Sequence, residues 1–180
     1  MAHLGVPRAG ALDPEAARLA NRLVGNPDEA AVLETTLTGV ALRAAASVTV
    51  AVTGAFAAVS VAGQRAGWGV PVTVGAGEVV EVGPASTGVQ SYLAVGGGIV
   101  VPPVLGSRSR DTLSGVGPAP LCNGDDLPVG AALPAPSGPD AELPNAELPN
   151  AAPGAPVDGP ARRGSPMAPH VGPPNRSCCG

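Results

Sequence analysis

The sequence predicts a mainly β domain that begins with one helix and is followed by a proline-rich tail. Near Pro27 the spacing of apolar residues changes from about 3.6 to 2, as expected where a helix gives way to strands. Short β-branched runs then alternate with glycine turns. Of the 22 prolines, 12 fall in the last 50 residues. We therefore divide the chain into a folded domain, residues 1–130, and a tail, residues 131–180, predicted to be disordered.

The helix is predicted to begin after Asp13. The Asp13 side chain is suited to accept a hydrogen bond from an amide of the first turn, and Pro14 has no N–H to be left unpaired there. Gly25 and Pro27 are the stop signals. Apolar residues at three- and four-residue spacing form a stripe that is predicted to face the core: Leu12, Ala16, Leu19, Ala20 and Leu23.

Six short strands are predicted after the helix. They are Val32–Leu37, Leu42–Thr53, Phe56–Val61, Val70–Val74, Glu78–Val82 and Gln90–Val95. The turns between them are predicted at Thr38–Gly39, Gly54, Gly63, Gly75–Gly77 and Gly83–Pro84. This succession of strands predicts a β-barrel or a sandwich. Low stability is expected, because a core of mostly alanine and valine buries little apolar area per residue.

Charge and hydropathy exclude several classes of partner. All ten basic residues are arginine and the net charge is −4, so we expect no basic face for nucleic acid or an anionic membrane. No apolar run approaches the roughly 20 residues of a membrane helix, and Met1–Gly5 does not resemble a signal peptide. The histidines and cysteines lack the spacing of a zinc site. We expect a cytoplasmic protein without a metal centre.

The tail contains a tandem repeat. Ala141–Asn145 reads Ala-Glu-Leu-Pro-Asn, and Ala146–Asn150 repeats it. Frequent proline blocks helices and removes strand donors, so polyproline-like disorder is expected. The tail is either a flexible arm that binds a partner or the product of translation in a changed reading frame, and we favour the second interpretation.

His3–Pro14 is the first candidate for a functional segment. It places the imidazole of His3, the guanidinium of Arg8 and the carboxylate of Asp13 before a helix. A helix N-terminus favours a carboxylate or a phosphate, which Arg8 is suited to clamp. His3 and Asp13 are the candidates for proton transfer. The alternative is structural: Asp13 caps the helix and Arg8 is solvated.

The loop Gly106–Asp111 is the second candidate. Ser107, Arg108, Arg110 and Asp111 place a hydroxyl, two guanidiniums and a carboxylate on it. This set of groups suits a small anion or a polar contact with another subunit. The alternative is an ion pair between arginine and aspartate whose only role is to stabilise a surface loop.

Familiar catalytic motifs are absent from the sequence. There is no Walker phosphate loop and no Gly-x-Ser-x-Gly nucleophile elbow. Gly96–Gly98 follows a predicted strand, but Pro102 and Pro103 forbid the helix that a dinucleotide-binding turn requires. We predict a tight turn or a close approach of backbones at these glycines.

The candidate segments also carry a family resemblance. Together with Ala20–Pro27 and Ser91–Ile99, the segments His3–Pro14, Pro102–Ser109 and Asp111–Thr112 resemble the biotin-dependent carboxyltransferase family. This family is also called allophanate hydrolase subunit 2 and includes the C subunit of 5-oxoprolinase. The resemblance implies a cyclophilin-like β-barrel-type fold and a companion subunit.

The resemblance further implies an activity. For 5-oxoprolinase it implies ATP-dependent opening of 5-oxoproline to glutamate, and for urea-degrading relatives it implies carboxyl transfer from carboxybiotin. The implied cofactors are therefore ATP, shared with a companion subunit, and a biotin carboxyl donor, and the implied substrate is a small cyclic or urea-like amide. We expect Arg8, Arg108 and Arg110, with Ser107 and Asp111, to bind its carboxylate or a phosphate.

The resemblance covers the first half of such a family member. We therefore expect a truncated subunit that is weakly stable and inactive alone. The first alternative is a non-catalytic regulatory module that binds a partner protein. The second is a non-functional gene fragment.

Overall fold

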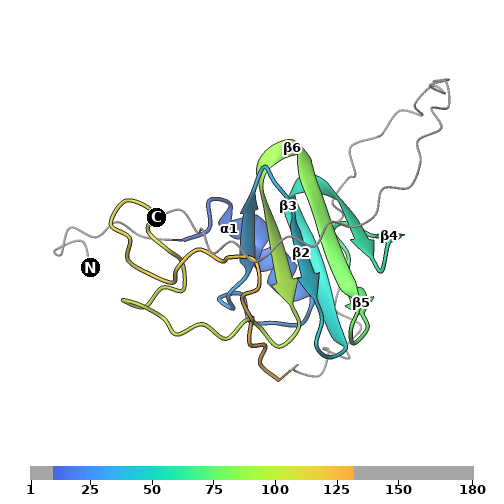
Figure 1. Cartoon of the computed structure of the whole chain (residues 1–180). Helices are drawn as coiled ribbons and strands as arrows, with labels where there is room; N and C mark the ends of the chain where they lie inside the picture. Colours follow the sequence, from blue (N-terminus) through green and yellow to red (C-terminus); the bar gives the residue numbers. More distant parts are fainter. Residues whose placement is uncertain (1–9, 132–180) are drawn as a thin grey trace, which may run out of the picture. The chain divides into compact units, whose positions relative to one another are not determined.

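The computed structural model describes residues 10–131, which form one helix and a six-stranded antiparallel sheet (Figure 1). The elements are α1 (Pro14–Leu23), β1 (Leu33–Thr36), β2 (Val40–Arg43), β3 (Val48–Val61), β4 (Gln64–Ala66), β5 (Val72–Val74) and β6 (Val79–Val95). The predicted mainly β fold with one N-terminal helix is confirmed. His3, Arg8 and the tail from residue 132 onward lie outside the described residues.

The sheet is open in the described part of the chain, so residues 10–131 do not form the closed barrel that was one of the two predicted architectures. The strand order is β1-β6-β3-β4, while β2 pairs with β6 and β5 with β3. Closure would require the two end strands, β1 and β4, to pair with each other. They are four and three residues long, and each is paired only with its own stretch of one long strand.

Two long strands organise the sheet, where the sequence predicted turns. β3 continues through Gly54 and β6 continues through Gly83–Pro84, and the two strands arch together (Figure 1). Shifts of register between Gly54 and Val59 mark bulges, which bend a strand without ending it. Pro84 is tolerated because it lies between the part of β6 that pairs with β2 and the part that pairs with β1.

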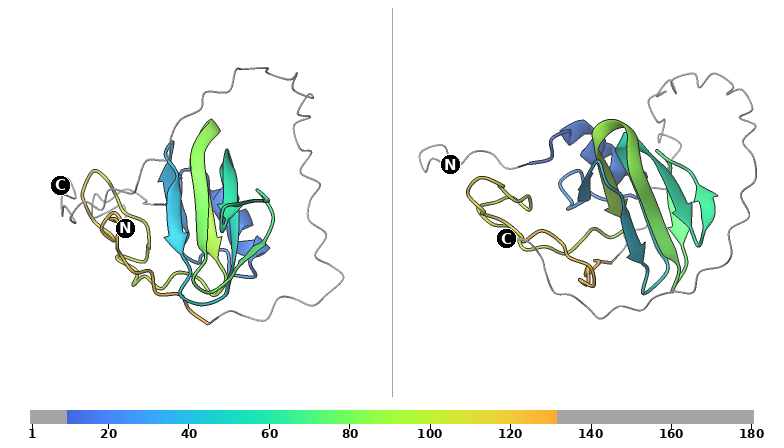
Figure 2. Two further views of the ribbon diagram at one scale, coloured as in Figure 1. Left: turned by 45° about the vertical axis from the view of Figure 1, so that its right-hand side comes forward. Right: turned by 45° about the horizontal axis from the view of Figure 1, so that its top comes forward.

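Helix α1 packs on one face of the sheet (Figure 2) through small residues. Ala17 and Ala20 are buried against Tyr92 and Ala94 of β6. The predicted stripe is therefore only partly right: Ala20 faces the sheet, but Leu12 is 71% exposed. Alanines let the helix approach closely where leucines would hold it off. No helix in residues 10–131 is long and apolar enough to cross a membrane.

The main core lies on the other face of the sheet, as the two-residue period of strands requires. In β6, Leu93 and Val95 point into this core, whereas Tyr92 and Ala94 between them point to α1. The core is rich in valine, as predicted: Val50, Val52, Ala57, Val59, Val74, Val80, Val82, Leu93, Val95 and Ile99. Val101 and Leu127, from the segment that follows β6, pack against it.

Candidate functional site

Asp13 caps α1, as the structural alternative predicted. Its Oδ1 accepts a hydrogen bond from the Ala16 amide at 3.0 Å, and its own amide donates to the Tyr92 hydroxyl at 2.8 Å. One carboxylate oxygen is therefore already used in the fold. The residue is exposed, and its other carboxylate oxygen accepts no hydrogen bond from any described residue.

A polar cluster around Tyr92 supports the start of α1. The fully buried Tyr92 places its hydroxyl 3.0 Å from Glu34 Oε1 and 3.3 Å from Gln90 Oε1. Glu34 also accepts from the Leu12 amide at 3.4 Å. The cluster thus accepts hydrogen bonds from the amides of Leu12 and Asp13, the two residues just before the helix. Sequence reasoning missed it, and the one available signal was a lone tyrosine within an apolar strand.

Burial raises the pKa of Tyr92 to about 12, and the nearby Glu34 carboxylate adds to the rise. A phenol whose folded pKa lies above its unfolded value of about 10 stabilises the fold fully below pH 10, and that contribution is lost as the pH rises toward 12. The Tyr92→Phe variant is therefore expected to be less stable than the parent at neutral pH, with the difference shrinking at high pH.

Urea unfolding of both proteins at several pH values measures this difference. Tyr92 is the chain's single tyrosine, so phenolate absorbance in the native state reports its titration alone. A native titration midpoint at the ordinary value of about 10 would contradict the buried, hydrogen-bonded phenol.

Gly96–Gly98 form a tight turn whose amides are all bonded within the protein. The Gly96 amide donates to Thr49 O (2.7 Å), the Gly97 amide to Asn26 Oδ1 (2.9 Å) and the Gly98 amide to Val95 O (2.9 Å). The predicted close approach of backbones is confirmed: a Cβ on Gly97 would lie 2.3 Å from the Gly130 carbonyl oxygen. No amide of this turn is left to cradle a phosphate.

Two buried asparagines lock this turn to the end of α1. Asn26 donates to Val95 O at 2.8 Å and to Asn21 Oδ1 at 3.2 Å. Asn21 in turn donates to Ala30 O at 2.9 Å. Buried amides with several partners hold a unique backbone geometry. We call Asn21, Asn26 and Gly97 the asparagine junction.

The second predicted candidate is an ordered loop. Val104 and Ser107 exchange two backbone hydrogen bonds around Leu105 and Gly106, which both have positive φ. Arg108 is exposed, and its Nε donates to Val101 O at 3.1 Å. This bond orients the guanidinium and uses only one of its five donors.

Asp111 is part of the loop's own structure. The buried carboxylate accepts from the Leu113 amide (3.1 Å) and from the hydroxyl and amide of Ser114. The Ser114 hydroxyl and these amides hold the pKa of Asp111 below its ordinary value. Within residues 10–131 it forms no ion pair with Arg108 or Arg110, so the alternative of an arginine–aspartate pair is wrong.

Arg110 also bonds within the loop. Its Nη1 donates to Pro118 O at 3.2 Å, and its Nη2 lies 3.7 Å from the position of a Cβ on Gly115. Of the two arginines, Arg110 thus spans the turn, whereas Arg108 has both Nη groups without a hydrogen bond to any described residue.

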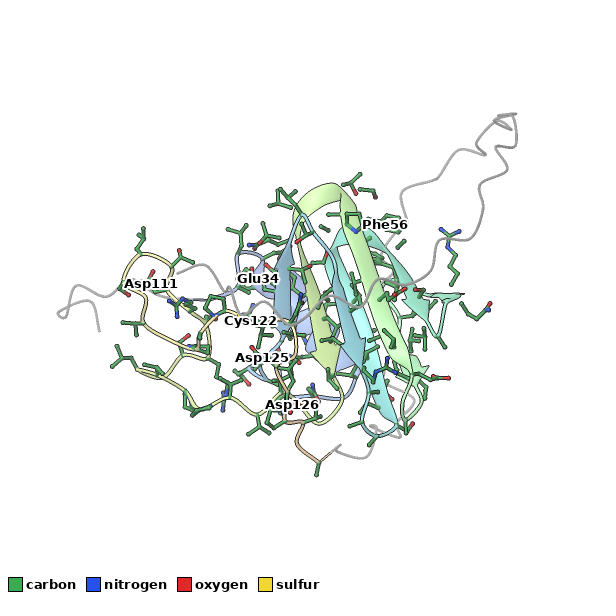
Figure 3. The ribbon with its side chains drawn as sticks, viewed as in Figure 1. Glu34, Phe56, Asp111, Cys122, Asp125 and Asp126 are labelled. Carbon is green, nitrogen blue, oxygen red and sulfur yellow. The ribbon has the colours of Figure 1, made fainter. Side chains whose placement is uncertain are left out.

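The predicted site residues fall into separate groups. Ser107, Arg108, Arg110 and Asp111 share one loop, and Figure 3 shows Asp111 of this loop apart from Glu34. No hydrogen bond or ion pair joins that loop to Asp13 within the described residues. Those residues also contain no group of three or more His, Cys, Asp or Glu side chains able to hold a metal ion.

Comparison with known proteins identifies relatives of this chain. The family "Carboxyltransferase domain, subdomain A and B" matches residues 4–162. The chain is 39% identical over 134 residues to urea amidolyase of Saccharomyces cerevisiae, covering 74% of this chain and 7% of that protein. It is 40% identical over 131 residues to the C subunit of 5-oxoprolinase from Escherichia coli, covering 70% of this chain and 42% of that relative.

Two solved structures of similar proteins superpose on this chain. The structure of TTHA0988 superposes with a TM-score of 0.68 at 38% identity, over 74% of this chain and 50% of that one. The urea amidolyase of K. lactis superposes with a TM-score of 0.57 at 37% identity, over 58% of this chain and 6% of that one. The chain thus spans half or less of each of these relatives.

Proposed function

Because the chain belongs to the family of carboxyltransferase domains with subdomains A and B, we propose that it is part of a cytoplasmic multi-subunit enzyme that acts on a small amide. The family match supports the class of enzyme. The chain covers 42% of the C subunit of 5-oxoprolinase but only 7% of urea amidolyase. That difference reflects the greater length of urea amidolyase, since the identity to the two relatives is 39% and 40%. We propose a cyclic amide carboxylate such as 5-oxoproline as the substrate to be tested first.

Arg108 is the residue that we propose binds the substrate carboxylate. It is exposed, its orientation is set by the bond to Val101 O, and its two Nη groups make no hydrogen bond with any described residue. A guanidinium with free Nη groups binds a carboxylate through paired hydrogen bonds. This pre-oriented cation is the single observation that carries the proposal for substrate binding.

Neither the Gly96–Gly98 turn nor the one unpartnered buried nitrogen of residues 10–131 fits the cofactors that the relatives suggest. The amides of Gly96–Gly98 are all bonded internally, so this turn does not hold the phosphates of ATP. The one buried side-chain nitrogen or oxygen without a partner in residues 10–131 is Trp68 Nε1. A single donor does not match the carbonyl and two N–H groups of a biotin ureido ring. We propose that a companion subunit supplies the ATP site.

Reconstitution tests the proposed function. The full chain is co-expressed with the proteins encoded beside its gene, and ATP hydrolysis and glutamate release are measured with and without 5-oxoproline. We expect 5-oxoproline-dependent turnover only when the chain is present. A parallel assay supplies urea and a biotin carboxyl donor. A stable complex in which neither reaction depends on this chain would overturn the proposal.

The Arg108→Ala variant is expected to raise the KM of the reconstituted enzyme for its carboxylate substrate roughly 10–100-fold, since a hydrogen bond to a charged group contributes about 1.5–3 kcal/mol. Arg108→Lys keeps the charge but loses the paired geometry, so an intermediate KM is expected. Arg65→Ala removes another exposed arginine, on β4, and is the control.

Arg110→Ala separates substrate binding from loop order. Because Arg110 bonds across its own turn, its loss is expected to speed amide hydrogen exchange at Asp111 and Gly115, which Arg108→Ala leaves unchanged. An unchanged KM in Arg108→Ala would remove Arg108 from the substrate site and leave the assignment of the enzyme class intact.

A further inference from the structure

Asn123 and Gly124 form the tip of an exposed turn between Cys122 and Asp125 (Figure 3). The Asp125 amide donates to Cys122 O at 3.1 Å, and the Cys122 amide donates to Asp125 Oδ2 at 2.8 Å. These two bonds close the turn at its base. The carboxamide of Asn123 and the amide of Gly124 make no hydrogen bond with any described residue.

The surroundings of this pair leave both reacting groups unhindered. Nothing lies within 4 Å of the place where a Cβ on Gly124 would stand, and Gly124 itself has no side chain to shield its amide nitrogen. The other described asparagines differ. Asn21 is buried with its amide bonded, and Asn26 precedes Pro27, which has no N–H to react.

We propose that Asn123 is a site of spontaneous deamidation. The Gly124 amide nitrogen loses its proton to solvent base and attacks Asn123 Cγ, forming a C–N bond. The carboxamide nitrogen takes a proton from water as its own bond to Cγ breaks, so that ammonia leaves and a five-membered succinimide remains. Water then adds to one of the two succinimide carbonyls. Opening at one gives aspartate, and opening at the other gives isoaspartate, in which the main chain runs through the side-chain carbon.

The product changes the charge and the path of this turn. It adds a carboxylate to a short segment that already carries Asp125 and Asp126. The isoaspartyl form also lengthens the main chain by one carbon, four residues before Leu127 packs on the core. The expected result is an acidic isoform of the protein whose turn hydrogen bonds at residues 122–125 are weakened.

Mass spectrometry of the full chain tests this. The protein is incubated at neutral and at alkaline pH in heavy-oxygen water and then digested. The peptide that contains Asn123 is expected to gain about 1 Da beyond the oxygen label, faster at alkaline pH, because the attacking amide must lose its proton. Asn123→Gln is expected to lose the modification, and Asn123→Asp provides the charge standard for the acidic isoform.

Three other asparagines are internal controls in the same digest. Asn26, which precedes proline, and Asn145 and Asn150, which precede alanine, are expected to stay unmodified while Asn123 converts. Conversion of Asn145 and Asn150 at the rate of Asn123, or an Asn123 peptide that stays intact at alkaline pH, would overturn the proposal. Neither result depends on the proposed enzyme activity.

Discussion

Replacing Gly97 with alanine is expected to lower the free energy of unfolding by about 2–6 kcal/mol. Backbone strain is expected to contribute about 1–3 kcal/mol and overpacking roughly another 1–3 kcal/mol. Gly97 has a φ of +93°, which side chains rarely adopt, and an added Cβ would lie 2.3 Å from the Gly130 carbonyl oxygen. Backbone on both sides of the contact cannot yield as a side chain would. Urea unfolding measures the loss.

Gly77→Ala is the matched control for this variant. Gly77 has a φ of +83°, but nothing lies within 4 Å of its would-be Cβ, so only the backbone strain is expected there. The difference between the two variants isolates the close approach of Gly97 to Gly130. Equal losses of stability would contradict that approach. A larger loss at Gly97 would show that residues 128–130 are held against the glycine turn in solution.

The local features of this turn were predictable, but its partners were not. Prolines at 102 and 103 excluded a dinucleotide-binding helix, and three successive glycines indicated a close approach of backbones. That the approaching chain is Gly130, and that Asn26 accepts from Gly97, depends on contacts between residues more than 30 positions apart. Local sequence patterns carry no information about such pairs.

The predicted ends of the strands were wrong for a related reason. Gly54 and Pro84 are turn-forming residues by local preference, yet both lie inside long strands. At Gly54 the nearby ring of Tyr92 leaves no room for a side chain, since an added Cβ would lie 2.9 Å from a ring carbon. Glycine is thus required there by packing across the sheet, which overrides its preference for turns.

The residue types were enough to locate the candidate loop, but the structure was required to assign a role to each residue. The sequence placed Arg108, Arg110 and Asp111 together without distinguishing them. The structure distinguishes Arg108, whose two Nη groups make no hydrogen bond with residues 10–131, from Arg110, which bonds across its own turn. The Asp111 carboxylate accepts hydrogen bonds from the Ser114 hydroxyl and the Leu113 amide. Hydrogen-bond partners within a loop are set by its exact path, which composition does not specify.

The Asn26→Leu variant is expected to lower the free energy of unfolding by about 1.5–4.5 kcal/mol, since two backbone groups would each lose a hydrogen bond. A half-buried amide would lose its partner, at a cost of about 1–3 kcal/mol, whereas a buried carbonyl would keep the Gly98 amide and lose about 0.5–1.5 kcal/mol. The groups are Val95 O and the Gly97 amide, which both bond to the Asn26 carboxamide. Leucine has a similar size, so the loss of hydrogen bonds dominates over any cavity. Urea unfolding gives the magnitude, and Asn123→Leu, at an exposed position, is expected to change stability by less than about 0.5 kcal/mol.

A double-mutant cycle with Asn21→Leu tests whether the asparagine junction acts as a unit. Asn26 donates to Asn21 Oδ1, so the double variant is expected to lose less stability than the sum of the two single variants. The junction joins α1 to the end of β6 and so holds the start of the segment that carries Arg108. Hydrogen exchange at the Val100 and Gly130 amides should therefore speed in Asn26→Leu, since both bond across this segment. Additive losses with unchanged exchange would mean that the two asparagines support their local turns independently and do not position the loop.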